Sequence, residues 1–149
     1  MRTFIVIALA SLTVAACDGS EAIGPGEPTE PGAASVRVRQ LYDISGGVYV
    51  EGAYSYVRVD ELDGDTVVEK KLDDPTQRDD RTFVSTAALS LDPGTYRLVS
   101  YQRPCEGNCG YLDPPTDRCA REIVVEAGTP LAVTISLQPG EGCSIETAR

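Results

Sequence analysis

Hydrophobic and polar side chains alternate along most of the chain after residue 34. Val36 and Val38 are each followed by an arginine, and the runs 57–59 and 131–137 repeat the same period of two. This period turns one face of a strand toward a core and the other toward solvent. Short runs of this kind, bounded by Gly, Pro and Asp, predict β-strands. We expect strands at residues 35–41, 48–51, 53–61, 65–72, 81–90, 95–103, 120–126 and 131–138.

Turn residues separate these runs. Hairpin chemistry is present at Gly46-Gly47, Asp63-Gly64, Asp92-Pro93-Gly94 and residues 127–130, and Asp63-Gly64 predicts a two-residue type I′ turn. Only the segment 82–89 is ambiguous, because its two adjacent alanines are poor strand formers. The sequence therefore predicts an all-β domain, a seven- or eight-stranded Greek-key β-sandwich of Ig-like or transthyretin-like type.

The first seventeen residues have a different pattern. An uncharged, mostly apolar stretch follows Arg2 and ends in the run Val14-Ala15-Ala16-Cys17. It is too short to span a bilayer as a mature helix, and small residues precede the cysteine. This segment resembles the signal of bacterial lipoproteins, which implies cleavage before Cys17 and lipidation of its thiol. An ordinary secretory signal with an unmodified Cys17, or an uncleaved membrane anchor, are the alternatives.

The domain boundaries follow from these segments. Residues 1–16 are the predicted signal peptide, and residues 17–34 are the lipidated Cys with a disordered linker rich in Pro, Gly and Glu. Residues 35–145 are enough for one β-sandwich domain with one core and too few for two. The resemblance to lipoproteins implies a location at the cell membrane, lipid-anchored and facing the periplasm or the cell exterior.

The cysteine count agrees with lipidation of Cys17. The chain has five cysteines, so assigning one to lipid leaves the even set Cys105, Cys109, Cys119 and Cys143. An exported protein occupies an oxidising compartment, so two disulfides are expected. Of the three connectivities we favour Cys105–Cys119 with Cys109–Cys143. A zinc site is the competing interpretation, but the spacings contain no C-x2-C pair and the chain has no His.

A second resemblance rests on the order of turns and strands between residues 48 and 138. It includes Val50-Glu51-Gly52-Ala53, an Asp-Gly hairpin, Phe83 and the run 91–98, in which a Pro-Gly turn precedes Tyr96. That run fits a tyrosine corner, whose phenol bonds back to the upstream backbone. The order resembles carboxypeptidase-regulatory-like and transthyretin-like sandwiches. This resemblance implies the fold and an accessory module without catalytic residues.

The connection 104–118 is too long for a simple hairpin, and loops of this length are usually functional or pinned. If strands 95–103, 120–126 and 131–138 formed a meander, Cys105, Cys119 and Cys143 would lie at one pole. The loop is then either stapled by disulfides for structural reasons alone or held as a recognition surface. Tyr and Arg are favoured anchors of such surfaces. The candidate binding residues are Tyr101, Arg103, Tyr111 and Arg118.

Two groups of carboxylates require calcium to be considered. Calcium takes six to eight oxygen ligands, but neither group has the order and spacing of an EF-hand loop. Solvated acidic loops are therefore the default interpretation, and we predict no metal site. The groups are Asp60, Glu61, Asp63 and Asp65, then Asp73, Asp74, Asp79 and Asp80.

Composition narrows the function classes. The absence of His removes the usual general base, and there is no Trp to line a glycosidase cleft. A net charge of −10 repels nucleic acid. We expect a non-catalytic binding or interaction module of the cell envelope, without a cofactor, held to the membrane by its lipid, with an envelope protein or polysaccharide as partner. The alternative is a structural accessory of an envelope assembly without a discrete ligand site.

Overall fold

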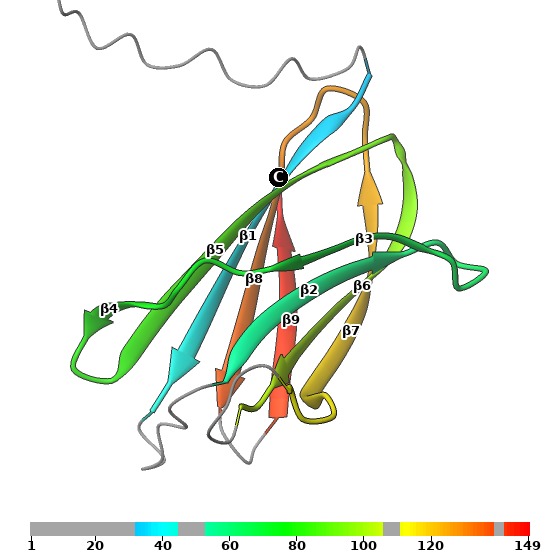
Figure 1. The fold of residues 1–149 in the computed structure, drawn as a ribbon. Coiled ribbons are helices and arrows are strands. Elements are labelled where there is room, and N and C mark those ends of the chain that lie inside the picture. The colour runs from blue at the N-terminus through cyan, green and yellow to red at the C-terminus, as the bar shows by residue number, and fades with distance from the viewer. Residues whose placement is uncertain (1–31, 45–52, 106–110, 139–141) are drawn as a thin grey trace, which may run out of the picture.

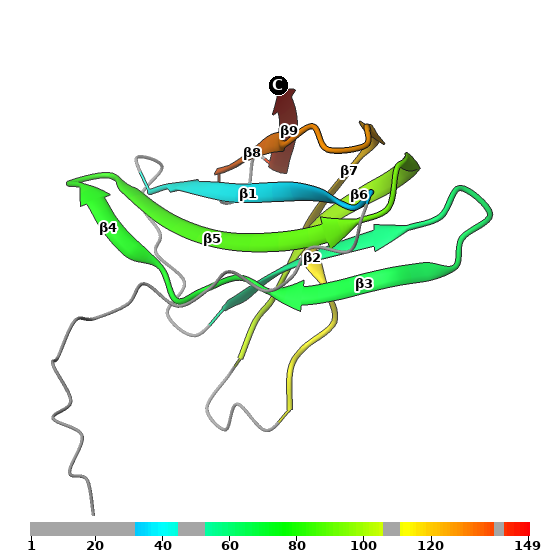
Figure 2. The same ribbon diagram turned by 90° about the horizontal axis from the view of Figure 1, so that it is seen from above.

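Two β-sheets packed face to face make up the domain (Figures 1 and 2). The computed structural model describes residues 32–44, 53–105, 111–138 and 142–149. Within them lie nine strands: β1 Ala34–Asp43, β2 Tyr54–Asp60, β3 Thr66–Lys71, β4 Thr76–Asp79, β5 Thr82–Leu91, β6 Gly94–Arg103, β7 Thr116–Val125, β8 Leu131–Gln138 and β9 Gly142–Ala148. The predicted all-β sandwich is confirmed. No helix in the described part of the chain is long and apolar enough to cross a membrane.

The sheet order explains how a chain with this pattern buries one face of each strand. One sheet has the order β4-β5-β1-β8-β9 and the other β3-β2-β6-β7. Strand β1 lies at the centre of the five-stranded sheet, antiparallel to β5 and parallel to β8. Its buried and exposed residues alternate from Ala34 onward, as the period of two predicts. Each such strand therefore contributes alternate side chains to a single core between the sheets.

Both long edges of the sandwich are closed by contacts between the sheets. At one edge the chain passes from β3 to β4, and the amide of Leu72 bonds to Ser55 in one sheet while the amide of Asp73 bonds to Thr86 in the other. At the opposite edge, β7 and β9 are joined by the Cys119–Cys143 disulfide. Because both edges are tied, the two sheets cannot separate along either side without losing these contacts.

The expected strands are found with small shifts at their ends, except that the expected strand 48–51 lies outside the described residues. The ambiguous segment 82–89 belongs to β5. Two further strands, β4 and β9, were not predicted. The meander considered for strands 95–103, 120–126 and 131–138 is wrong, because β6 and β7 pair in one sheet whereas β8 belongs to the other. The turns at residues 92–94 and 127–130 therefore link the two sheets and are not hairpins, because turn chemistry alone does not determine which strands pair.

The turn at Asp63-Gly64 also differs from its prediction. The amide of Glu61 donates to the carbonyl of Asp65 at 2.8 Å, and the amide of Gly64 donates to the carbonyl of Glu61 at 3.0 Å. Three residues therefore lie between the closing pair, and only Gly64 has a positive φ, of 108°. This is a turn followed by a left-handed glycine, the common three-residue hairpin loop, and not a type I′ turn.

The tyrosine corner is confirmed. The hydroxyl of Tyr96 donates to the carbonyl of Asp92 at 3.1 Å. Burial raises the pKa of Tyr96, and the nearby carboxylate of Asp92 adds to the effect. A Cβ on Gly94 would lie 3.1 Å from the tyrosine ring, so the glycine lets the ring lie against the backbone. The corner fixes the point where the chain crosses from β5 to β6.

Inward-facing residues change in character along the sandwich. Near the start of β1 they are aliphatic and almost fully buried, as at Val36, Val38 and Leu98. Toward the end of β1 several buried inward positions are polar, at Gln40, Ser85, Ser100 and Gln102, although Ile135 and Leu137 of β8 stay aliphatic. At that same end β6 and β8 finish, while β2, β7 and β9 begin (Figure 1). Since it carries the described cysteines, we call it the cysteine pole.

Candidate functional site

A disulfide at the cysteine pole ties β7 to β9. Cys119 and Cys143 have Cα atoms 5.6 Å apart and join strands of different sheets. Two residues farther along each strand, the guanidinium of Arg121 donates to the carbonyl of Ile145. Cys105 is also disulfide-bonded and is buried directly after β6. The three described cysteines therefore lie at one end, as the loop argument expected, although by a different topology.

The favoured disulfide connectivity is wrong. The bridge Cys119–Cys143 excludes both Cys105–Cys119 and Cys109–Cys143. The expectation assumed that Cys119 closes the base of the 104–118 loop. In the structure Cys119 instead faces the neighbouring sheet, because it is paired with the inward-facing Ser100 and borders the core. Cys109 lies outside the described residues.

The described base of the loop is held by Arg103. Its guanidinium donates to the carbonyl of Leu112 at 3.1 Å and to that of Asp113 at 3.3 Å. The amide of Asp113 donates in turn to the carbonyl of Pro104 at 3.0 Å. Next to this anchored segment, Tyr111 is 86% exposed. A guanidinium thus fixes the backbone from which an exposed aromatic side chain projects.

Tyr101 lies on the outer face of the four-stranded sheet and is only 6% exposed. Its ring stacks on that of Tyr56, with centroids 5.5 Å apart and planes inclined by 9°. Burial and a hydrogen bond to Glu69 raise the pKa of Tyr101 to about 12. Since Glu69 is on β3 and Tyr101 on β6, the phenol reaches across β2. The two rings form a flat aromatic layer on the sheet.

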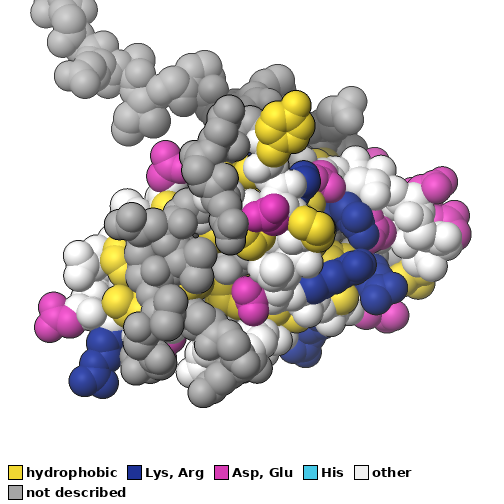
Figure 3. Space-filling model, turned by 60° about the horizontal axis from the view of Figure 1, so that its bottom comes forward, with side chains coloured by type: hydrophobic (Ala, Val, Ile, Leu, Met, Phe, Trp, Pro, Cys, Tyr) yellow, Lys and Arg dark blue, Asp and Glu magenta, His cyan; other side chains and the backbone are white. Residues whose placement is uncertain are grey.

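A second aromatic contact continues this layer toward the cysteine pole. Tyr54 is paired with Arg103 across β2 and β6, and the ammonium of Lys71 lies 3.9 Å from the centroid of the Tyr54 ring. Such a cation–π contact stabilises both groups in place. Figure 3, which looks toward this pole, shows basic side chains gathered beside hydrophobic ones, with acidic side chains around them. The surface is therefore both aromatic and cationic.

The structure distributes the four predicted binding residues over this pole. Tyr101 is buried in the aromatic layer and Arg103 holds the loop, whereas Tyr111 and Arg118 are exposed. Arg118 lies where β7 carries an extra residue opposite β6, beside Asp117 with its φ of 47°. Bulges commonly redirect side chains near functional sites. Their role in binding stays a prediction.

Sequence reasoning missed Tyr54, Tyr56 and Lys71. Each occupies an alternate, outward position of its strand, where the period of two predicts a polar, solvated face. The signal available was the pair of tyrosines two residues apart on one strand, because such residues share a face. Recognising the site also requires knowing that β2 lies between β3 and β6, which the turns do not indicate.

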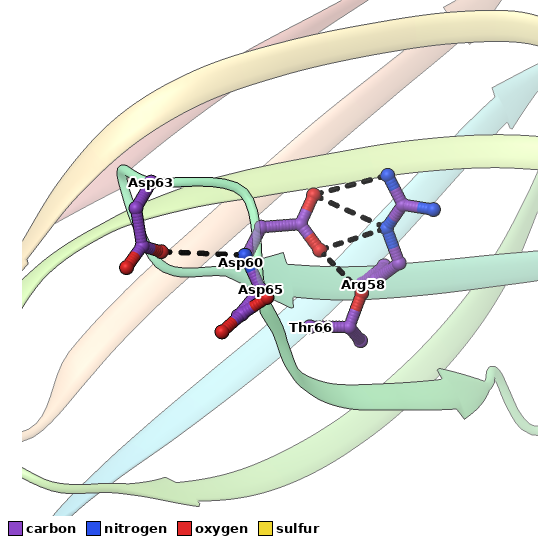
Figure 4. Close-up of polar contacts among 5 residues, drawn as sticks. All are labelled: Arg58, Asp60, Asp63, Asp65 and Thr66. Atoms are coloured by element: carbon purple, nitrogen blue, oxygen red, sulfur yellow. Dashed lines mark hydrogen bonds and ion pairs between the residues drawn. The ribbon is translucent and has the colours of Figure 1, made fainter.

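Two carboxylates of the acidic group at the β2–β3 hairpin, those of Asp60 and Asp63, have protein partners (Figure 4). One carboxylate oxygen of Asp60 accepts from the hydroxyl of Thr66 at 2.9 Å and lies 2.9 Å from the guanidinium of Arg58, which also donates to the other oxygen. A carboxylate of Asp63 accepts from the amide of Asp65. Within the part of the chain that is described, no three acidic or cysteine side chains are arranged to hold a metal ion.

No family model matches this chain, and no curated protein matches it. Among solved structures it is similar to a "putative cell adhesion protein" from Bacteroides fragilis NCTC 9343, with a TM-score of 0.41 and 11% identity. The match covers 79% of this chain and 45% of that chain. The chain thus spans less than half the length of this structural relative.

Proposed function

We propose that this protein is an exported, lipid-anchored and non-catalytic binding module of the cell envelope, whose binding end is the cysteine pole. The observation that carries the proposal is that exposed Tyr111 and Arg118 lie at the same pole as the Tyr54–Lys71 contact. Aromatic and Arg side chains on a rigid frame are the usual anchors of recognition. An envelope protein or a polysaccharide is the partner.

The direction in which the chain enters the domain supports a binding end at the cysteine pole. The predicted lipid anchor at Cys17 precedes Ala34, which begins β1 at the end opposite the cysteine pole (Figure 1). A chain held at Cys17 therefore enters the domain at the far end from Tyr111. Two or more acyl chains hold a protein stably at a membrane. The recognition loop would then face away from the lipid surface.

A structural accessory without a ligand site is the second candidate, and it would pair through sheet edges. The edge strand β3 carries Glu69, Lys70 and Lys71, and the other described edge beside it, β4, has only four residues. Charged and very short edges oppose pairing with another chain. The binding module is therefore the better supported of the two.

The anchor is tested by the intact mass of the protein purified from its native membrane. Loss of residues 1–16 with added acyl mass is expected, and a Cys17→Ser variant should leave the membrane fraction. An unmodified Cys17 would contradict the proposal.

The binding end is tested by cross-linking in the envelope with a Tyr111→Ala, Arg118→Ala double variant. A matched control, Arg37→Ala with Leu62→Ala, removes exposed side chains away from the cysteine pole; Leu62 is 62% exposed. Partners recovered with the wild type and the control should be lost or reduced at least fivefold with the double variant. An unchanged set of partners in all three samples would refute a binding role for this pole.

A further inference from the structure

Four strands change from aliphatic to polar at the same level of the sandwich interior. Along β1 the buried series Val36, Val38 is followed by Gln40, and along β5 the series Leu89, Ala87 is followed by Ser85. On β2 and β6 the corresponding inward residues are Ser55 and Gln102. Apolar residues at these positions would complete the core. The change on these four strands forms a polar compartment at one side of the core, since Ile135 of β8, paired with Gln40, stays aliphatic and fully buried.

The four polar residues face one another as two cross-strand pairs. Gln40 is paired with Ser85 in the five-stranded sheet, and Ser55 is paired with Gln102 in the four-stranded sheet. Together they line a cavity of about 40 Å³ between the sheets, whose lining also includes Tyr54, Phe83 and the β3–β4 crossing at residues 71–75. A cavity of this size holds about three water molecules.

The hydrogen bonding of this compartment is incomplete within the protein. Gln40 is only 2% exposed, yet none of the side-chain hydrogen bonds among the described residues involves its amide. Gln102 donates one long bond, 3.4 Å, to the hydroxyl of Ser55. Among the described residues no fully enclosed side-chain polar atom lacks a partner, so the amide of Gln40 faces the cavity. A carboxamide offers two donors and two acceptor lone pairs, and a buried one requires a partner.

The chemistry of the lining selects a neutral ligand. Two amides and two hydroxyls carry no formal charge, whereas a buried ion would require a counter-charge. The charged groups Lys71, Asp73 and Asp74 stand at the mouth, where Lys71 already pairs with Asp74 at 3.4 Å. A hydroxyl both donates and accepts, so it can satisfy either end of an amide. The ring of Tyr54, with the Lys71 ammonium over it, borders the mouth and adds apolar surface that a sugar ring can contact.

We propose that a neutral saccharide binds at the mouth of this cavity, with one hydroxyl group of its terminal sugar inserted between Gln40 and Gln102. The inference sharpens the proposed function by naming a ligand class for the same pole. Its test uses residues inside the sandwich, distinct from Tyr111 and Arg118. Failure of one proposal can therefore be told apart from failure of the other.

The experiment is a titration of the full mature protein, in a detergent without a sugar headgroup, with glucose, galactose, N-acetylglucosamine and their disaccharides. Nuclear magnetic resonance follows the ¹⁵N-labelled side-chain amides of Gln40 and Gln102. At least one sugar should shift both signals saturably at concentrations below about 20 mM. Gln40→Leu should weaken that binding at least tenfold. Gln138→Leu is the matched control, because Gln138 is an exposed residue of the same sheet, and it should bind as the wild type does.

Several outcomes would overturn the proposal. One is the absence of any shift with every sugar, which would assign the cavity to structural water. Another is a shift produced by acetamide and short Asn- or Gln-containing peptides but not by sugars, which would assign it to a peptide amide. Equal binding by wild type and Gln40→Leu would also refute it. Should Gln40→Leu fail to fold, Ser85→Val narrows the same cavity from the neighbouring strand and must weaken sugar binding in its place.

Discussion

The two ends of the sandwich interior differ in the polarity of their inward-facing side chains. Around Val36 and Leu98 the space between the sheets is filled with aliphatic side chains that are fully buried. Around Gln40 and Gln102, toward the cysteine pole, four inward positions are polar and line a cavity, while Ile135 and Leu137 on β8 stay aliphatic. Burial of apolar surface drives folding, whereas buried polar groups gain little unless they are paired. The contrast indicates that apolar packing stabilises one end, whereas the polar part of the interior at the other end is free to serve binding.

Truncation at the aliphatic end should have the largest effect. Leu98→Ala removes a fully buried side chain of β6 and should lower the free energy of unfolding by about 3–5 kcal/mol. Urea unfolding measures this, with Val124→Ala on the exposed face of β7 as the control. A loss below about 1 kcal/mol would mean that stability does not reside at this end.

Removal of the β7–β9 bridge should come next. The bridge closes a separation of 24 residues, for which the loss of chain constraint predicts about 3 kcal/mol. Cys119→Ala with Cys143→Ala should therefore lower stability by about this amount. Amide hydrogen exchange should show β9 losing protection first. If the midpoint of unfolding were unchanged, the cysteine pole would not depend on its covalent tie.

Loss of the tyrosine corner should have a smaller effect. Tyr96→Phe keeps the ring but removes the bond to the carbonyl of Asp92, at a cost of about 1 kcal/mol. Thermal unfolding measures the change. A fall comparable to that of Leu98→Ala would show that the corner organises more of the aliphatic end than one hydrogen bond.

At the polar end, an apolar substitution should cost almost nothing. Gln40→Leu replaces an unpaired amide with a side chain of similar size, so stability should stay within about 1 kcal/mol of the wild type or rise. The same urea titration checks this against Leu98→Ala. A large loss would mean that the amide is structurally required, and the contrast between the two ends would then fail.

The smallest predicted effect is the change of stability with pH that comes from ionisation of Tyr101. It is absent at neutral pH and appears only in alkaline solution. The folded state holds the pKa of Tyr101 at about 12, above the ordinary value near 10. The unfolded chain therefore loses the phenolic proton at a lower pH than the folded protein does. The stability that Tyr101 contributes is complete below pH 10 and declines as the pH rises toward 12. Ultraviolet absorbance of phenolate in wild type and Tyr101→Phe isolates the titration. If Tyr101 titrates with the exposed tyrosines, its phenol is not buried.

Sequence reasoning reached the features that depend on neighbours along the chain. Alternation at Val36 and Val38 predicted a half-buried strand, and the Pro-Gly turn before Tyr96 predicted the corner. It failed for features that depend on contacts between segments far apart in the sequence. The pairing of Cys119 follows from the placement of β7 beside β9, and the strand Thr76–Asp79 is exposed throughout, so it carries no hydrophobic pattern.

For the same reason, only part of the candidate site could be predicted from the sequence. Tyr111 was recognisable because it lies in a long cysteine-bounded loop. Gln40 was harder to find, since one polar residue in an alternating strand is unremarkable alone. The polar compartment becomes visible only when Gln40 and Ser85 are paired and set opposite Gln102, which requires the register of two sheets.

The central position of β1 has a mechanical consequence. Its first residue, Ala34, stands at one end of the sandwich and the cysteine pole at the other, so tension between them runs along the strand. The ladders to β5 and β8 lie across that direction, because hydrogen bonds between strands are roughly perpendicular to them. Load would therefore shear two ladders together instead of unzipping one bond at a time. A domain held at its N-terminus and pulled at its far pole would resist extraction by the slow rate of that concerted rupture.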